Sequence, residues 1–484
     1  MSRPQAPLKG QARLDNDRLT PALRAYLLAY VTTILPRLTA TVQLLSRPSL
    51  SKKEKVQVFL SALRAPISLK SLPTACAIIV GGSTALPQLV VESLLQLTST
   101  CSSHKKLLIH NFCSRYLITI CSFWSAWTAF ILLNRDKNWA RKRAASLTKD
   151  HQLQNMGSER YAGRTIDLTS FVACRAMDIV VTNLWSRSTA RRQCWSPPRK
   201  YAAFCFERLA DPAIFAFSSA VIMWSWFYSP ERLPLAYNAW ITKVAELDNR
   251  LLNALRLCRR GEFVYGDASS ANADLPQLCA ELGLPEECGD PIVTIPIPCE
   301  LYHCGTGRSC EVHACTRFIR SFRLAVRLYV PLQLVSLLQN TTFPKKRLLN
   351  AFKSTIRSSS FLASFVALFY YGVCCARTRL GPRLFSTKTI TPQMWDSGLC
   401  ILAGCLACGW SILLEKRNRR QEIAFFVAPR ALATLLPRVY DSRHQFKEQL
   451  AFATSAAIIM SSIQNQHRNS IRGVFGNVLT RVLK

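Results

Sequence analysis

The chain reads CELYHCGTGRSCEVHACTRFIRSFRLAVRLYVP from Cys299 to Pro331, where a dense Cys/His segment runs into a basic, apolar-rich stretch. Within that stretch Arg320, Arg323 and Arg327 recur three and four residues apart among apolar residues. Side chains at this spacing share one face of an α-helix, so the stretch predicts an amphipathic helix at a membrane surface. Long apolar runs lie on both sides of it, and together these features predict an all-α membrane protein.

The composition favours a membrane protein over a soluble one. The chain has 484 residues, 49% of them hydrophobic, and a formal net charge of +34. Many basic residues flank long apolar runs, as at 135–143, 187–192 and 416–420, where they would meet anionic lipid headgroups. A nucleic-acid binder would explain the charge but not the apolar runs. The predicted partners are therefore the lipid bilayer and anionic headgroups, with a homo-oligomer left open, and no nucleic acid.

Apolar runs that are candidates to cross a bilayer occur in both halves of the chain. They lie at 73–97, 116–133, 166–185, 209–228, 359–376, 398–414, 423–436 and 450–463. A spanning helix needs about 20 residues, so the last two runs are also interpreted as partial spans or buried helices. The runs predict a polytopic bundle of about eight membrane helices.

Charge and proline content divide the chain into five segments. They are a basic amphipathic N-terminal region at 1–70, a first membrane half at 71–228, a polar connector at 229–298, the Cys/His-rich segment at 299–317 and a second membrane half at 318–484. The N-terminal region lacks the pattern of a cleavable secretory signal, so we expect insertion through the internal helices. A mitochondrial presequence, which has a similar charge bias, is the alternative interpretation of that region.

Three short motifs recur in the same order in the two membrane halves. ALRAY matches AVRLY, FVACRA matches FVAPRA and FAFSSAVIMWS matches FATSAAIIMSS, at 22–26 and 325–329, 171–176 and 426–431, and 215–225 and 452–462. One short match arises easily by chance in helix-rich sequence, whereas three in the same order favour a common origin. The sequence therefore predicts two tandem related halves.

Four charged side chains lie inside predicted membrane helices. Asp167, Arg175 and Asp178 belong to one of these helices, and Arg430 belongs to a later one. A charge at mid-bilayer costs about 2.5–3.5 kcal/mol on insertion scales, so such residues normally face a bundle interior or an opposite charge. Arg175 and Asp178 are three residues apart, which predicts a local ion pair. The alternative is that the four residues line a path for a solute.

The Cys/His segment carries six zinc-compatible side chains within 17 residues. Zinc takes four such ligands, usually as closely spaced pairs. The predicted ligands are Cys299, His303, Cys310, His313 and Cys315. Their spacing matches no standard zinc finger, so reduced thiols that cap the following helix, or a redox pair, are alternative interpretations.

Elsewhere the chain shows no sign of a catalytic site. It lacks a Gly-rich nucleotide loop in a strand–turn–helix context, a G-x-S-x-G elbow and an H-E-x-x-H motif. Cysteines inside apolar runs, such as Cys374 and Cys400, are interpreted as small hydrophobic residues. The sequence therefore predicts no enzyme and no cofactor, with a zinc ion at the Cys/His segment left open. A membrane-bound redox or metal-dependent protein that uses the Cys/His segment is the alternative.

Two patches of the chain resemble the transmembrane protein 135 family. The pattern P-C-x3-H-x6-C-x4-C-x2-F-I-R at 298–320, followed by A-x-R-x-Y-x-P-L, resembles the family's cysteine-rich region. The stretch SILLEKRNRRQEIAFFVAPRALA at 411–433 also looks like that family. The first half departs from the pattern, because no Cys/His cluster precedes Ala22. The chain is similar, more distantly, to four-helix inner-membrane protein-translocase subunits and to a small peroxisomal membrane protein.

The resemblance implies a function as well as a location. It implies a multi-pass protein of the peroxisomal membrane, or next of the mitochondrial membrane, that is linked to lipid homeostasis and organelle dynamics. Because the family carries no established catalytic residues, none is transferred to this chain. The expected function is therefore non-enzymatic, either structural or permitting the passage of a solute or lipid.

Overall fold

The computed structural model describes residues 9–45, 52–97, 103–135, 161–189, 195–267, 274–338, 345–386, 388–438, 440–465 and 471–483. Within these ranges the regular structure is helical apart from two short strands, β1 (Tyr161–Ala162) and β2 (Tyr440–Asp441), which pair antiparallel. The prediction of an all-α fold is confirmed.

The chain folds into two compact units, Met1–Trp195 with Pro437–Lys484, and Ser196–Leu436. The helices described in the first unit are α1 (Lys9–Leu45), α2 (Lys52–Arg64), η1 (Ala65–Ile67), α3 (Leu72–Leu97), α4 (Ser103–Asn134), α6 (Ile166–Thr189), η10 (Ser442–His444), α18 (Gln445–Asn465) and α19 (Gly473–Leu483). The unit thus combines the start of the chain with its last helices.

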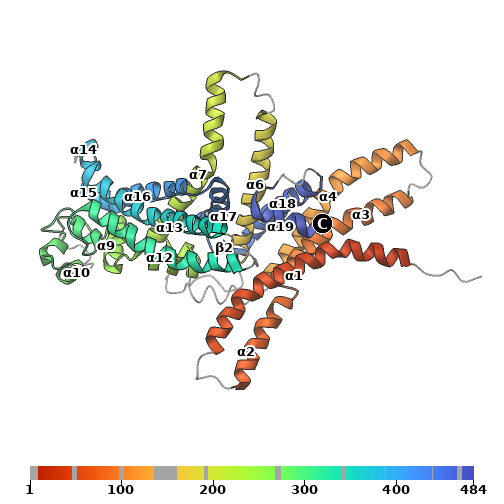
Figure 1. The fold of residues 1–484 in the computed structure, drawn as a ribbon, viewed down its shortest axis with the longest axis horizontal. Helices are drawn as coiled ribbons and strands as arrows, with labels where there is room; N and C mark the ends of the chain where they lie inside the picture. The colour runs from red at the N-terminus through yellow and green to blue at the C-terminus, as the bar shows by residue number, and fades with distance from the viewer. Residues whose placement is uncertain are drawn as a thin grey trace, which may run out of the picture. The chain divides into compact units, whose positions relative to one another are not determined.

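Helices α3 and α4 lie side by side in the first unit (Figure 1), and small residues let them approach closely. Gly82 shows this best, because a Cβ atom there would lie only 1.9 Å from Ser125 Oγ. On another face of α4, the Phe130 ring packs against Phe452 of α18 with 5.7 Å between ring centroids. Helix α18 therefore belongs to the core of this unit.

The second unit contains the helices that build the Cys/His site. They are α7 (Pro197–Tyr228), η5 (Pro230–Arg232), α8 (Leu235–Ala245), α9 (Asn249–Arg260), α10 (Leu275–Glu281), η6 (Glu286–Gly289), α11 (Cys299–His303), α12 (Cys310–Leu338), α13 (Lys345–Cys374), η7 (Cys375–Arg379), α14 (Gly381–Leu384), α15 (Pro392–Met394), η8 (Trp395–Leu399), α16 (Cys400–Cys408), η9 (Gly409–Leu414) and α17 (Arg417–Leu435). Both η7 and η8 are single π-helical turns. The core of the second unit includes the fully buried Trp226, Phe227, Leu251 and Ile401.

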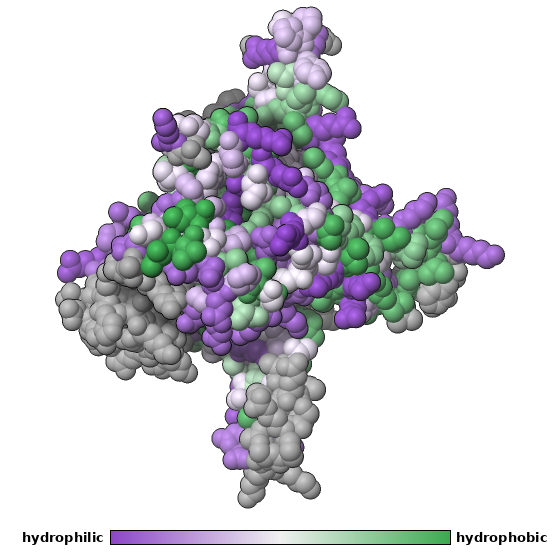
Figure 2. Space-filling view, turned by 90° about the vertical axis from the view of Figure 1, so that its left-hand side faces the viewer, coloured by the Kyte–Doolittle hydropathy of each residue, from purple (hydrophilic) through white to green (hydrophobic). Residues whose placement is uncertain are grey.

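The face that carries α9, α10 and α14 is largely polar. Figure 2 looks onto this face and shows hydrophilic residues spread over it, with apolar residues in small groups between them. Residues 229–298, predicted as a polar connector, contribute α8 to α10 and no helix long enough to span a bilayer among the residues described.

Five helical stretches in the described part of the chain are long and apolar enough to cross a membrane. They are Glu54–Ser93, Tyr116–Asn134, Pro197–Tyr228, Lys345–Leu384 and Pro392–Leu414. Helices α6, α17 and α18, which the sequence suggested as further spans, form as helices but are not among these five. The all-α architecture is thus consistent with a membrane protein, and the count of eight spans stays a prediction.

Candidate metal centre

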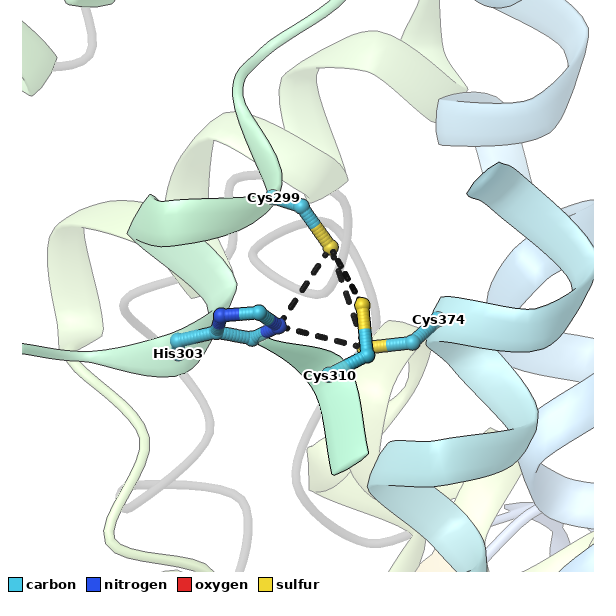
Figure 3. Close-up of side chains that lie close together, drawn as sticks. All are labelled: Cys299, His303, Cys310 and Cys374. Carbon is cyan, nitrogen blue, oxygen red and sulfur yellow. Dashed lines mark hydrogen bonds between the residues drawn. The ribbon is translucent and has the colours of Figure 1, made fainter. Parts of the chain in front are cut away.

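Four side chains from three helices converge in the second unit (Figure 3). Cys299 and His303 lie one turn apart on α11, Cys310 begins α12, and Cys374 ends α13. Their ligand atoms all lie within 4.8 Å of one another. Three of these residues were predicted from the sequence, and the fourth comes from a helix that was predicted only as a membrane span.

The separations of these atoms fit a tetrahedral zinc ion. Cys299 Sγ lies 3.7 Å from Cys310 Sγ and 3.8 Å from Cys374 Sγ. His303 Nε2 lies 3.5 Å from Cys299 Sγ and 3.6 Å from Cys374 Sγ. With Zn–S near 2.3 Å and Zn–N near 2.0 Å, tetrahedral angles place two sulfurs about 3.8 Å apart and a sulfur and a nitrogen about 3.5 Å apart. These four separations therefore match those of a Cys3His site.

The orientation of His303 suits metal binding. Its Nδ1 lies 2.6 Å from the carbonyl oxygen of Gly307, and the ring is fully buried. An N–H at Nδ1 that donates to this carbonyl leaves the Nε2 lone pair free to face the sulfurs of Cys299 and Cys374, the arrangement in which histidines usually hold metals. Gly305 and Gly307, with φ of +78° and +92°, form the turn that brings Cys310 back toward Cys299.

The electrostatics of the cluster favour a thiolate. Hydrogen bonding with Cys374 and then with His303 lowers the pKa of Cys299 to about 4, against the effect of burial. Burial alone would lower the pKa of His303, but its bonds to Cys299 and Gly307 outweigh this and raise it. Thiolates are the form of cysteine that binds metals, so the cluster is prepared for a cation.

Two predicted ligands do not belong to the cluster. His313 is fully buried beside it, where its ring stacks on His303 at 4.6 Å and its Nδ1 lies 2.6 Å from Thr306 Oγ1. Burial lowers the pKa of His313 to about 3, so its ring is neutral. Cys315 is exposed, because five residues along α12 turn a side chain roughly 140° away from Cys310. Cys374 takes their place.

A buried ion pair adjoins the cluster. Asp396, on η8, is fully buried and accepts two hydrogen bonds from Arg377 of η7, at 2.6 and 2.7 Å. The hydroxyls of Tyr302 and Tyr265 also donate to it, at 3.0 and 2.5 Å. Tyr302 lies on α11 between Cys299 and His303, so this network positions the helix that carries two of the ligands.

The sequence analysis missed both Cys374 and this ion pair. Cys374 reads as one more small residue of an apolar run, and only the arginines that follow it mark the end of that run. Asp396 is the one acidic residue between Arg377 and Glu415, directly before an apolar stretch. An isolated acid beside a membrane helix was the signal that could have identified it.

The charged residues predicted inside membrane helices have separate surroundings. Asp178 forms an ion pair with Arg472, not with Arg175 as predicted. The guanidinium of Arg175 lies near both the Phe171 and Phe475 rings, at 5.6 and 5.4 Å from their centroids. These cation–π contacts direct it away from the acid three residues on.

Asp167 and Arg430 are also accounted for. Asp167 has a side chain that is 54% exposed and pairs with Arg438 at 2.6 Å. Arg430 lies in the second unit, with its guanidinium carbon 3.7 Å from the centroid of the Phe426 ring and 5.9 Å from that of Tyr237. The four residues therefore do not form one cluster within either unit.

Comparisons with protein-family models, curated proteins and solved structures found no match to this chain. The resemblance to the transmembrane protein 135 family stays a prediction from the two sequence patches.

Proposed function

We propose that the chain is a non-enzymatic, multi-pass integral membrane protein whose second unit is held by a structural zinc ion. The outward-facing apolar stripe of α1 carries the membrane part of the proposal. Leu19, Leu23, Leu27, Val31 and Leu35 recur every four residues and are 52–61% exposed. In water such a continuous stripe would be costly, whereas lipid chains are a suitable surrounding for it.

The interior of the helix bundle supports the same conclusion. Several fully buried side chains of α3 and α4 are small, among them Ser83, Ser122, Ala126 and Ala129. Large apolar residues outside and small or hydroxyl residues inside are typical of packed membrane helices, which associate through close contact of their backbones.

The zinc part of the proposal follows from the closed geometry. Four protein ligands fill a tetrahedral coordination sphere, and three of them, His303, Cys310 and Cys374, are buried. Catalytic zinc sites keep one position for water or substrate, whereas structural sites use four protein ligands. Bound zinc would tie α11, α12 and α13 together.

The organelle and the biological role are proposed from the sequence patches. We place the protein in the peroxisomal membrane, with the mitochondrial membrane second, in lipid homeostasis and organelle dynamics. Anionic headgroups are the partners of its basic loops, and self-association is compatible with the exposed stripe of α1. The passage of a lipid is the activity most compatible with an apolar cavity in the second unit, considered below.

We also infer that the two halves are tandem copies that have exchanged their last helices. The burial of 215–224 on α7 repeats residue by residue in 452–461 on α18. Yet α7 packs in the second unit and α18 in the first. In both units an arginine of the repeated FVAxRA motif lies over the phenylalanine four residues before it and near an aromatic residue of α8 or α19.

Two experiments test the proposal. The first fractionates a tagged protein against peroxisomal and mitochondrial markers and extracts each membrane pellet with alkaline carbonate; release into the soluble fraction contradicts a membrane protein. The second measures zinc in purified wild type and in Cys310→Ser. Loss of zinc in the variant is expected. Wild type without zinc, but with thiols that oxidise to a disulfide, would favour the redox alternative.

A further inference from the structure

The second unit has a half-open cavity of about 610 Å³ between α7, α8, α12, α13 and α17. Apolar and aromatic side chains dominate its lining, among them Ile222, Met223, Leu332, Phe361 and Val366. Helical interiors are otherwise close-packed, with few voids larger than a water molecule. A volume between 300 and 1,000 Å³ is typical of a small-molecule site, so the cavity suits one ligand with a large apolar part.

A cation lies next to two of the residues that line this cavity. Phe426 and Tyr237 both line it, and the Arg430 guanidinium carbon lies 3.7 and 5.9 Å from the centroids of their rings. Arg430 donates one hydrogen bond, from Nη1 to the Phe426 carbonyl oxygen at 2.5 Å. A guanidinium has five N–H donors, so others are available to a ligand. Among the described residues, none of the ion pairs formed involves Arg430.

Comparison of the repeated motifs shows why this arginine differs from its counterpart. Arg175 is the corresponding residue of the first half, and three residues after it comes Asp178, a buried acid paired with Arg472. Three residues after Arg430 the chain has the fully buried Ala433 instead. The second half therefore keeps the arginine, as Arg430, but has no acid at the position that corresponds to Asp178, and it has the cavity.

We propose that this cavity binds a single long-chain carboxylate of the fatty-acid type, with its chain among the apolar residues and its head group at Arg430. A carboxylate matches the planar fork of a guanidinium and forms short, charge-assisted hydrogen bonds with it. The inference rests on the proposed membrane function, because a bilayer is the source of such a ligand. It extends that function by naming the ligand class and the residue that recognises it.

The test uses the full-length protein in lipid nanodiscs and a hexadecanoate that carries a photoactivatable diazirine in its chain. Crosslinked peptides are identified by mass spectrometry. We expect labelling on residues of α7, α12 and α13 that line the cavity. Unlabelled hexadecanoate should compete at least about ten-fold better than its methyl ester, which has the same chain but no charge. A lysophosphatidate competitor distinguishes a carboxylate site from one for any anionic head.

Variants provide the controls. Arg430→Gln should remove the preference for the acid over the ester, and Arg430→Lys should restore part of it. Leu332→Trp should block labelling, whereas Leu334→Trp should not, because both leucines are exposed on α12 but only Leu332 lines the cavity.

Equal competition by acid and ester in the wild-type protein would overturn the proposal, even if every variant failed to fold. So would labelling that Leu332→Trp leaves unchanged. Competition by lysophosphatidate alone would assign the site to a phosphate head group instead. If the protein resists carbonate extraction but shows no preference for the acid over the methyl ester, only this inference is contradicted. Release by carbonate would contradict the proposed membrane function itself.

Discussion

At the scale of single residues, the Cys/His centre depends on which thiols reach a common point. Cys310 and Cys374 do so although they belong to different helices, whereas Cys315, on the same helix as Cys310, is exposed. The number of cysteines in a segment is therefore a weaker guide to a zinc site than the direction in which each cysteine side chain leaves its helix.

Cys374→Ser should lose zinc as completely as Cys310→Ser, because a tetrahedral site with three protein ligands binds zinc far more weakly. Metal analysis of the purified protein measures this. The matched controls are Cys375→Ser, the neighbour outside the cluster, and Cys315→Ser, which should both keep about the wild-type zinc content. Loss of zinc in Cys315→Ser would show that the ligand set is different.

Asp396→Ala should destabilise the second unit by about 3–5 kcal/mol, because it leaves the Arg377 charge buried without a partner. Thermal unfolding in detergent, followed by tryptophan fluorescence, measures the change. Glu311→Ala is the control, since its pair with Arg379 is about half exposed and, as a surface ion pair, contributes little to stability. Similar shifts for the two variants would mean that the buried pair contributes little.

At the scale of helices, close approach is decided by small residues rather than by hydropathy. The apolar run at 73–97 indicated a span, but the side chain absent at Gly82 sets how near α4 can lie. Where a helix begins is likewise decided by single residues that cap its first turn. Asp248 begins α9 by accepting the backbone N–H of Arg250 at 2.8 Å.

Gly82→Ala should destabilise the first unit by about 1–3 kcal/mol, because the new methyl group overlaps Ser125 and forces α3 and α4 apart. The double variant Gly82→Ala with Ser125→Gly should recover much of that loss, since it removes the overlapping atoms. Thermal unfolding of the two variants and the wild type measures the recovery. Additive losses would show that the two helices do not meet at these residues.

Asp248→Ala should lower the free energy of unfolding by about 1 kcal/mol, because α9 loses its N-terminal cap. Hydrogen bonds from Arg250 lower the pKa of Asp248, so its folded pKa lies below its unfolded pKa. Its contribution is therefore complete above the unfolded pKa and is lost as the pH falls through the folded pKa. Asp248→Asn keeps a cap and should abolish this part of the acid sensitivity, as unfolding between pH 6 and about pH 2 would reveal. An unchanged pH profile would contradict the assignment.

At the scale of the whole molecule, the proposed exchange determines which helices depend on one another. Phe452 of α18 meets Phe130 of α4, whereas its counterpart Phe215 of α7 meets Phe361 of α13, each pair with ring centroids 5.7 Å apart. In the proposed exchange, each compact unit is completed by a helix from the other half of the sequence.

Phe452→Ala should couple with Phe130→Ala by about 0.5–1.5 kcal/mol in a double-mutant cycle. The losses of stability from Phe452→Ala and Phe361→Ala should be additive. The Phe452 side chain would contact Phe361 if α18 packed within its own half. Thermal unfolding of single and double variants measures both cycles. Coupling to Phe361 in place of Phe130 would exclude the exchange.

The sequence by itself determined the helical class, the positions of the five apolar stretches and three of the four zinc-compatible ligands. Each of these depends on hydropathy or on spacing within a short segment, such as one turn from Cys299 to His303. Only the tertiary structure decided that Cys374 joins them, that Asp178 pairs with Arg472 and that α18 lies against α4. These contacts join segments far apart in the chain, and they depend on how whole helices pack, which no local pattern of residues specifies.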